Sequence, residues 1–328
     1  MEKISVIIPA YNAEGTIKRC IESILSGAGQ NLFDLEIVVV NNGSTDNTKD
    51  IVSQIASKHN EVILFSQENK GPAGSRDTGL KNATGDYIAY CDSDDWVDNN
   101  WLLDLYTTLK TYNADISCCR AIINGVNTTY NPQEYLVWNR DEAIKEFIIH
   151  KRLNGCLWNK LIRRELFDGI SFSLEMWYWE DLYVVWQILK RASVVVRHNV
   201  GTYNFYVHPD SMCAKKISEN RVYCTLKVWR EIVDDCNLLF PNHMKAALNT
   251  QENWALSEMR SMIKGNMYNK EFETEISHIV RKAGIAGILN QKGLTHKLFA
   301  LAIILNVNMV RVLYCIISKK MKCYENRS

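Results

Sequence analysis

Three aspartates stand within four residues of one another in the segment from Gly85 to Trp96, directly after a mostly apolar run, Tyr87 to Cys91. The run predicts a buried strand, and because burying unpaired carboxylates is costly, we expect Asp92 and Asp94 just beyond its carboxyl end. Alternate side chains of an extended segment point the same way, so these two can face one ion. Carboxylate oxygens suit Mg²⁺ or Mn²⁺, which commonly hold a diphosphate as well. The other interpretation is a turn of acids that cap the following helix.

A second acidic pair, Glu180 and Asp181, follows three aromatic residues at the predicted start of a helix over 180–190. A carboxylate held beside an acceptor hydroxyl can take its proton, and it works through position and partial desolvation because its intrinsic basicity is weak. The alternative is that both acids only complement the positive end of the helix. The residues by themselves leave both interpretations open.

Polar and aromatic side chains also follow the first two predicted strands. Tyr11, two residues after Pro9, offers a ring face for stacking a base, and Asn42 offers an amide for a base edge. Arg76, in a predicted helix, offers a planar fork for a diphosphate. Because parallel strands deliver their following loops to one edge of a sheet, we expect these residues to meet Asp92 there. The alternatives are an ordinary core aromatic and an ordinary Asn-Asn-Gly turn.

Alternating strands and helices position these side chains. Apolar, β-branched runs predict strands over 4–9, 35–40, 62–65 and 87–91. Helical spacing predicts helices over 17–25, over 47–58 and from Gly71 onward. Because strand and helix alternate in this way, we expect an α/β fold with a doubly wound, mainly parallel sheet flanked by helices.

The alternation loosens after residue 96. Further helices are expected over 101–110, 141–150 and 180–190. Further strands are expected over 114–119, 156–162, 194–197 and 202–207. From residue 218 onward we expect only helices, over 218–238, 241–263, 270–284 and 295–320. The sequence therefore predicts a domain over 1–214 that carries the site and a helical C-terminal region over 215–328.

Composition excludes several classes of protein. At 328 residues the chain can bury a large core, and its net charge of +1 gives no support for nucleic-acid binding. The ten cysteines form no CxxC pair, which indicates reduced, cytosolic thiols, and we expect no signal peptide because the N-terminus enters a strand at once. No GxGxxG motif follows the first strand, which argues against a dinucleotide-binding dehydrogenase. No GxxxxGK[ST] motif follows it either, which argues against a P-loop hydrolase.

Four segments together resemble the family 2 glycosyltransferases, nucleotide-sugar enzymes of the GT-A fold. These segments are VIIPAYN (6–12), VVVNNGSTDNT (38–48), NKGPAGSRDTG (69–79) and NATGDYIAYCDSDDWV (82–97). The resemblance implies inverting transfer of a sugar from a nucleotide-diphosphate donor, with Mn²⁺ or Mg²⁺ as cofactor. It also implies donor-binding roles for residues matching the family's motifs, namely Pro9, Tyr11, Asn42, Arg76, Asp92, Ser93 and Asp94, of which Asp92 and Asp94 hold the metal.

The chain departs from the family at two of these positions. The family often has aspartate where this chain has Asn41 and Asn42, which leaves the preference for uridine open. The family's usual Arg-Asn pair is Arg76-Asp77 here, so the phosphate role passes to Arg76 and Asp77 stays unassigned.

The resemblance continues into the acceptor half. By the family's Glu-Asp motif, Asp181 is the expected base and Glu180 helps to bind the acceptor, beside Trp179. Trp158 lies in a segment similar to the family's Trp-Asn-Lys-Leu strand, which borders the acceptor cleft; a purely structural strand is the alternative. His208 falls in a loop, 203–211, that resembles a family loop closing over the diphosphate. The resemblance implies that His208 is a third metal ligand, and the alternative is an ordinary surface histidine.

The C-terminal region carries a different signal. The run from Phe299 to Ile317 is almost wholly apolar and leads into a cluster of lysines around Lys320. The run is interrupted by Asn306, Asn308 and Arg311, and polar residues at its centre argue against a transmembrane span. Two interpretations stay open: a helix lying on the inner membrane leaflet with its lysines on anionic lipid, and a helix packed on the catalytic domain or in a homo-oligomer.

The sequence thus predicts a cytoplasmic glycosyltransferase, peripheral to the membrane if the C-terminal helix binds it. We expect it to move a sugar, from a UDP-sugar in the first instance, to an oligosaccharide or lipid-linked glycan in bacterial surface polysaccharide synthesis, a class implied by the family alone. Two alternatives remain. A catalytically silent sugar-nucleotide binder would bind donor without transfer, and a nucleotidyltransferase would normally open with a Gly-rich loop after its first strand.

Overall fold

The computed structural model describes residues 1–27, 32–127, 131, 133–207, 217–290 and 294–305. The chain divides into two compact units, Met1–Ala214 and Lys215–Ser328. His208 and the apolar run beyond Leu305, with its lysines, lie outside the described residues.

The first unit is built on one ten-stranded sheet. Its strands are β1 (Lys3–Ala10), β2 (Asp34–Asn42), β3 (Val62–Gln67), β4 (Tyr87–Tyr90), β5 (Trp96–Val97), β6 (Ile116–Ile123), β7 (Val126–Asn127), β8 (Tyr135–Asn139), β9 (Lys160–Arg163) and β10 (Val194–Phe205). They lie in the order β3-β2-β1-β4-β9-β6-β10-β5, with β7 beside β6 and β8 beside β10.

Strand directions agree with the predicted mainly parallel α/β sheet. The pairs β2–β3, β1–β2, β1–β4 and β6–β10 are parallel. Strand β9 runs antiparallel to both of its neighbours, β4 and β6. Several expected boundaries were wrong. Strand β9 begins at Lys160 because the preceding residues form a loop, and the strand expected over 114–119 is β6, which continues to Ile123. The two strands expected over 194–207 are one strand, β10, with register shifts on either side of Gly201.

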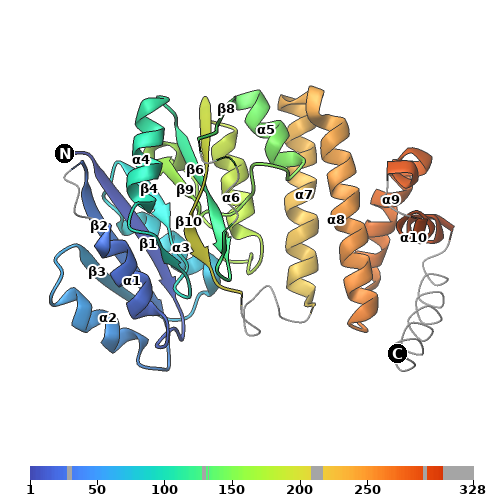
Figure 1. Cartoon of the computed structure of the whole chain (residues 1–328). Helices are drawn as coiled ribbons and strands as arrows, with labels where there is room; N and C mark the ends of the chain where they lie inside the picture. Colours follow the sequence, from blue (N-terminus) through green and yellow to red (C-terminus); the bar gives the residue numbers. More distant parts are fainter. Residues whose placement is uncertain (28–31, 128–130, 132, 208–216, 291–293, 306–328) are drawn as a thin grey trace, which may run out of the picture. The chain divides into compact units, whose positions relative to one another are not determined.

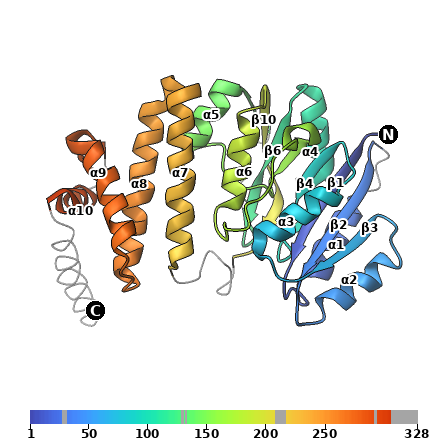
Figure 2. The ribbon, with the colours of Figure 1, turned by 180° about the vertical axis from the view of Figure 1, so that it is seen from behind.

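Helices cover both faces of the sheet. They are α1 (Ile17–Ser26), α2 (Thr48–Ala56), α3 (Gly71–Asn82), α4 (Trp101–Thr111), α5 (Arg140–Ile148) and α6 (Glu180–Leu189), with a short 3₁₀ helix, η1 (Arg164–Phe167). Helices α1, α2 and α4 lie in front of the sheet in Figure 1, and α3 and α6 lie in front of it when the molecule is turned round in Figure 2.

Strand β1 shows why these runs are apolar throughout. Ile4, Val6 and Ile8 are fully buried in one core cluster with residues of α1 and α4. Ile7 points to the opposite face, where Gly79 of α3 lies so close that an added methyl group would overlap the Ile7 side chain. A central strand of a parallel sheet is buried on both faces, so it reads as a continuous hydrophobic run.

The second unit is helical where it is described, as predicted. Its helices are α7 (Glu219–Leu239), η3 (Pro241–His243), α8 (Met244–Lys264), α9 (Lys270–Asn290) and α10 (Leu294–Leu305). Helix α9 is broken at Gly284, where φ is 60° and ψ is −149°, a conformation that favours glycine. Leu226, Met259, Ile276 and Ile303 are among the side chains of its apolar core. Across the helices that the structure describes, none combines the length and apolar character that a membrane crossing needs.

Candidate active site

The carboxyl ends of three parallel strands bring the predicted donor residues to one edge of the sheet. Ala10 of β1 is paired with Asn41 of β2, and Ile7 of β1 is paired with Tyr90 of β4. Strand β2 ends at Asn42, and the segments that follow β1 and β4 leave the sheet beside it. They carry Tyr11, which is half exposed, and the aspartate turn. This is the edge where open α/β sheets bind their ligands.

Arg76 joins the two acidic clusters predicted from the sequence. Its Nη2 donates to Asp92 Oδ1 at 2.7 Å, and its Nη1 donates to Glu180 Oε1. The side chain is only 11% exposed. Burial opposes the charge, but Asp92, Glu180 and Asp181 outweigh it and raise the pKa of Arg76 above its usual value. The acids expected to serve the donor and those expected to serve the acceptor thus belong to one site.

Burial shifts the acceptor-side acids toward higher pKa values. The pKa of Glu180 is raised to about 7, chiefly by burial, with the Arg76 charge opposing and Asp181 adding to the shift. Burial also raises the pKa of Asp181, while Arg76, the backbone N–H of Leu182 and the Lys160 ammonium oppose it. A carboxylate with a raised pKa is a better proton acceptor than one in water.

Lys160 is a functional candidate that the sequence did not single out. Its side chain is completely buried, and its Nζ donates to Asn154 Oδ1 at 3.0 Å, to the Cys156 carbonyl at 2.6 Å and to Asn159 Oδ1 at 2.8 Å. A buried ammonium with three oxygen acceptors is well compensated and fixed in place. The signal in the sequence is the position of Lys160 in the Trp-Asn-Lys-Leu segment, Trp158–Leu161.

A strained residue starts the helix that carries Glu180 and Asp181. Trp179 has φ 64° and ψ 14°, the left-handed conformation, which costs a residue with a Cβ about 1–2 kcal/mol. Both acids lie in the first turn of α6, where they also complement the helix dipole. Strain of this kind persists only where the surroundings impose it, and the next residue, Glu180, contacts Arg76.

The segment before α6 is packed against α3. The Trp177 ring lies so near Gly71 that an added Cβ would stand 3.1 Å from its Cε2, and Leu174 is similarly close to Gly74. The backbone N–H of Phe172 donates to Asp77 Oδ1 at 3.3 Å. The two glycines and Asp77, which the sequence left unassigned, therefore hold the acceptor-side segment on the helix that carries Arg76.

The third aspartate of the acidic turn is structural. Asp95 is 1% exposed, its Oδ2 accepts a hydrogen bond from Tyr203 Oη at 2.7 Å, and its Oδ1 accepts one from the Tyr206 backbone N–H at 2.7 Å. Burial raises the pKa of Asp95 to about 8, with Asp92 adding to the shift. Tyr203 Oη in turn accepts a hydrogen bond from the Asp92 backbone N–H at 3.1 Å. Strand β10, which carries Tyr203, therefore holds both ends of the acidic turn.

Trp158 packs on the aromatic residues of β10. Its ring stacks on Tyr203 at 4.6 Å and on Phe205 at 5.5 Å between centroids, and the side chain is half buried. This is the structural role that the sequence left open beside acceptor binding, and the acceptor contact stays a prediction.

Asn42 is engaged with its own protein. Its amide oxygen accepts from Gln67 Nε2 at 2.7 Å and from the Lys70 backbone N–H at 3.1 Å. Its Nδ2 donates to Asn69 Oδ1 at 3.2 Å and to the Gly71 carbonyl at 3.0 Å. The residue thus holds the loop that leads into α3, and the predicted contact with a base requires it to exchange one of these bonds.

The donor set at Asp92 and Asp94 fits a divalent cation that is shared with phosphate. Both carboxylates are half buried at the sheet edge. Among the described residues, at this site and elsewhere, no group of three His, Cys, Asp or Glu side chains lies close enough together to hold a metal ion. Mg²⁺ and its like are commonly bound by one or two carboxylates, with substrate phosphates and water completing the shell.

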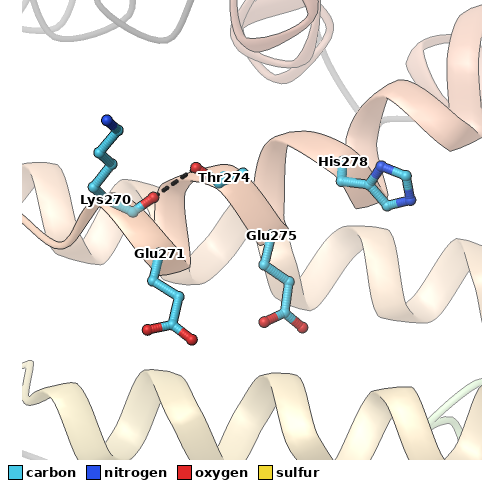
Figure 3. A pocket seen from close by; sticks show the side chains of 5 residues that line it. All are labelled: Lys270, Glu271, Thr274, Glu275 and His278. Atoms are coloured by element: carbon cyan, nitrogen blue, oxygen red, sulfur yellow. Dashed lines mark hydrogen bonds between the residues drawn. The ribbon is translucent and has the colours of Figure 1, made fainter.

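A hollow of about 670 Å³ lies on the second unit. It is lined by Lys270, Glu271, Thr274, Glu275 and His278, all on α9 (Figure 3). Thr274 Oγ1 donates to the Lys270 carbonyl at 2.7 Å, and Glu275 pairs with Arg230 of α7. Because all five lining residues come from a single helix, we assign this hollow no chemistry.

The parallel sheet, the acidic turn at its carboxyl edge and the arginine that ties this turn to a Glu-Asp pair define a glycosyltransferase of the GT-A fold. Residues 5–170 match the model of the family "Glycosyl transferase family 2". The chain belongs to this family, and the resemblance seen in the sequence is confirmed.

Relatives and solved structures agree with this assignment. The chain is 25% identical to glycosyltransferase GlyA of Streptococcus pneumoniae over its whole length, but it spans only 47% of that protein. It is 33% identical to the cholesterol galactosyltransferase of Borreliella burgdorferi, over 73% of this chain and 71% of that one. The crystal structure of S. aureus TarS 1–349 shares the fold with a TM-score of 0.70 at 19% identity, over 94% of this chain and 89% of that one.

Proposed function

We propose that this chain transfers a sugar from a nucleotide-diphosphate donor, a UDP-sugar in the first instance, to a glycan hydroxyl with inversion at the anomeric carbon. The observation that carries the proposal is the bridge from Asp92 through Arg76 to Glu180. One buried cation reaches both a carboxylate suited to the metal–diphosphate and the pair of acids suited to the acceptor.

Each residue then has a defined task. Asp92 and Asp94 would hold a divalent cation, which when bound neutralises charge on the departing diphosphate. Arg76 adds directed donors to the same phosphates, and Pro9, Tyr11, Asn42 and Ser93 line the nucleotide side.

On the acceptor side, Asp181 takes the proton of the attacking hydroxyl while Glu180 orients it. Because attack is in line, the hydroxyl oxygen bonds to the anomeric carbon as the bond to the diphosphate breaks. Inversion follows from this single displacement. Trp158 and Trp179 are proposed to border the acceptor.

Proteins of known ligand support the choice of donor and metal. TarS has been solved with UDP and with UDP-GlcNAc. A mannosyltransferase of Pyrobaculum calidifontis, with a TM-score of 0.59 to this chain, has been solved with GDP-Man and Mn²⁺. One relative is a poly(ribitol-phosphate) beta-glucosyltransferase of Bacillus spizizenii, 34% identical over 38% of this chain. The TarS complexes favour a UDP-sugar, the mannosyltransferase complex favours Mn²⁺ as the divalent cation, and the glucosyltransferase relative favours a role in a bacterial surface polymer.

We further propose that the C-terminal helices contact the inner membrane leaflet, which would place a cytoplasmic enzyme near a lipid-linked acceptor. Leu298, Leu301 and Leu305 form one exposed stripe on α10. The lysines that follow in the sequence suit anionic lipid. Deleting residues 296–328 should abolish binding to anionic vesicles. If the deletion instead dissociates a dimer and leaves vesicle binding unchanged, the packing alternative is supported.

A thermal-shift screen of nucleotide sugars with Mn²⁺ tests the donor. A ligand of the native state raises its stability by mass action, by about 2.7 kcal/mol at a hundred times its dissociation constant. We expect a UDP-sugar to give the largest Mn²⁺-dependent shift and to release UDP when a glycan acceptor is added. A shift without transfer to any acceptor would favour a silent binder, and pyrophosphate release from a nucleoside triphosphate and a sugar phosphate would favour a nucleotidyltransferase.

A further inference from the structure

Arg19 of α1 contacts the acidic turn from a part of the chain that the proposed site does not include. Its Nη2 donates to the main-chain carbonyl of Asp94 at 2.7 Å. Its guanidinium carbon lies 3.9 Å from the centre of the Trp96 ring and 5.9 Å from that of Tyr206. The two rings are themselves 6.4 Å apart. An exposed arginine is thereby fixed in one place by a directed hydrogen bond and by two aromatic faces.

The turn that Arg19 holds is short and densely charged. It closes with a hydrogen bond of 3.1 Å from the Asp95 backbone N–H to the Asp92 carbonyl. Asp95 anchors it from inside the protein, through Tyr203 and the Tyr206 backbone. Arg19 anchors it on the other side of Asp94, through the Asp94 carbonyl. The carboxylates of Asp92 and Asp94 repel each other, since the charge of Asp94 contributes to raising the pKa of Asp92, and a fixed cation reduces this repulsion.

We propose that Arg19 is a positioning residue for Asp94. It holds the Asp94 main chain, and with it the direction of the Asp94 carboxylate, in the shape that a metal–diphosphate needs before the ligand arrives. This inference rests on the proposed function of Asp94. Partners that orient a metal ligand from behind commonly change metal affinity about 10- to 100-fold when they are removed.

The chemistry of the contact favours arginine over lysine. A guanidinium is planar, so it can stack on the Trp96 ring while one of its N–H groups points at the Asp94 carbonyl. A lysine ammonium keeps the charge but cannot do both at once. Arg19→Lys should therefore recover only part of what Arg19→Ala loses.

Titration calorimetry with UDP and with GDP, each in Mn²⁺ and in EDTA, tests the proposal. Lys18→Ala is the matched control, because Lys18 is the neighbouring exposed cation on α1 and its ion pair is with Glu22, away from the turn. We expect Arg19→Ala to reduce the gain in nucleotide affinity from Mn²⁺ about tenfold. Affinity in EDTA and the melting temperature of the free protein should stay near wild type, and Lys18→Ala should change nothing.

Two results would overturn the proposal. An equal loss of nucleotide affinity in Mn²⁺ and in EDTA would mean that Arg19 contacts the nucleotide itself. An unchanged gain in affinity from Mn²⁺ would mean that the Arg19 contact has no role in metal binding. If wild type binds neither nucleotide with Mn²⁺, the proposed function fails, and hydrogen exchange of the ligand-free protein still tests Arg19. We expect amides of residues 94–97 to exchange faster in Arg19→Ala than in Lys18→Ala, and equal rates would reject the positioning role.

Discussion

Asp92 and Glu180 lie on opposite arms of one guanidinium, that of Arg76, although they come from different halves of the first unit's sequence. Each carboxylate is partly desolvated, and each relies on the same cation for compensation. A change in the charge of either acid is therefore felt by the other through Arg76. The relationship makes the donor side and the acceptor side of the site one electrostatic unit.

Arg76→Lys should separate the two acids. A lysine has no fork and cannot reach both carboxylates in the geometry that Arg76 uses, so we expect transfer to fall about 100-fold or more. Arg163→Lys is the matched control, since Arg163 of β9 pairs with Asp115 away from the site. Steady-state kinetics with both variants measures the effect, and near-normal transfer by Arg76→Lys would show that the bridge has no part in the reaction.

Asp181→Asn should remove the proposed base and keep the fold. We expect kcat to fall by about 10² to 10⁴ while the affinity for UDP with Mn²⁺ is unchanged. Asp141→Asn is the control for the helix-dipole interpretation, because Asp141 also lies in the first turn of a helix, α5. If the two variants behave alike in kcat and stability, Asp181 only complements its helix; if Asp181→Asn loses UDP affinity, its role lies with the donor.

Stability should fall as pH rises through the range in which Glu180 titrates. Its pKa is raised from 4.5 to about 7 in the folded protein, so between these values the native state holds a proton that the unfolded chain has released. The free energy of unfolding should decrease across this window, by on the order of 3 kcal/mol from Glu180. Urea titrations from pH 4.5 to 7.5 measure the slope. Glu180→Gln should make the slope shallower by the Glu180 share, and the remaining slope belongs to other buried acids with raised pKa values, such as Asp95. A slope that Glu180→Gln leaves unchanged would place the whole titration at those acids.

Gly71→Ala should disturb the acceptor side through packing. Gly71 has φ +72°, and an added Cβ would stand 3.1 Å from the Trp177 ring. Gly125→Ala is the matched control, because Gly125 has φ +79° with open space around its Cβ position. Both variants should lose about 1 kcal/mol for the left-handed backbone. Only Gly71→Ala should also raise the KM for the acceptor, and equal kinetics in the two variants would exclude a role for the Trp177 contact.

The order of elements and the identity of the acidic turn were already determined by the sequence. Apolar runs such as Ile4–Ile8 are typical of buried strands, and the spacing of Ile17, Ile21 and Ile24 is typical of a helix with one buried face. The expected elements before residue 150 accordingly lie within a few residues of the observed ones. These patterns are local, because burial on a strand or helix repeats with the geometry of the backbone itself.

Only the tertiary structure decided which polar groups meet. Arg76 was expected to bind phosphate, but its partners Asp92 and Glu180 depend on α3 and α6 packing together. In the sequence, Asn42 and Asp95 are candidates for a binding site or a turn. In the structure, each is hydrogen-bonded to a segment distant in the sequence. Hydrogen bonds between distant segments leave no periodic trace in a sequence, since one side chain of the right type suffices and its partner is chosen by the fold.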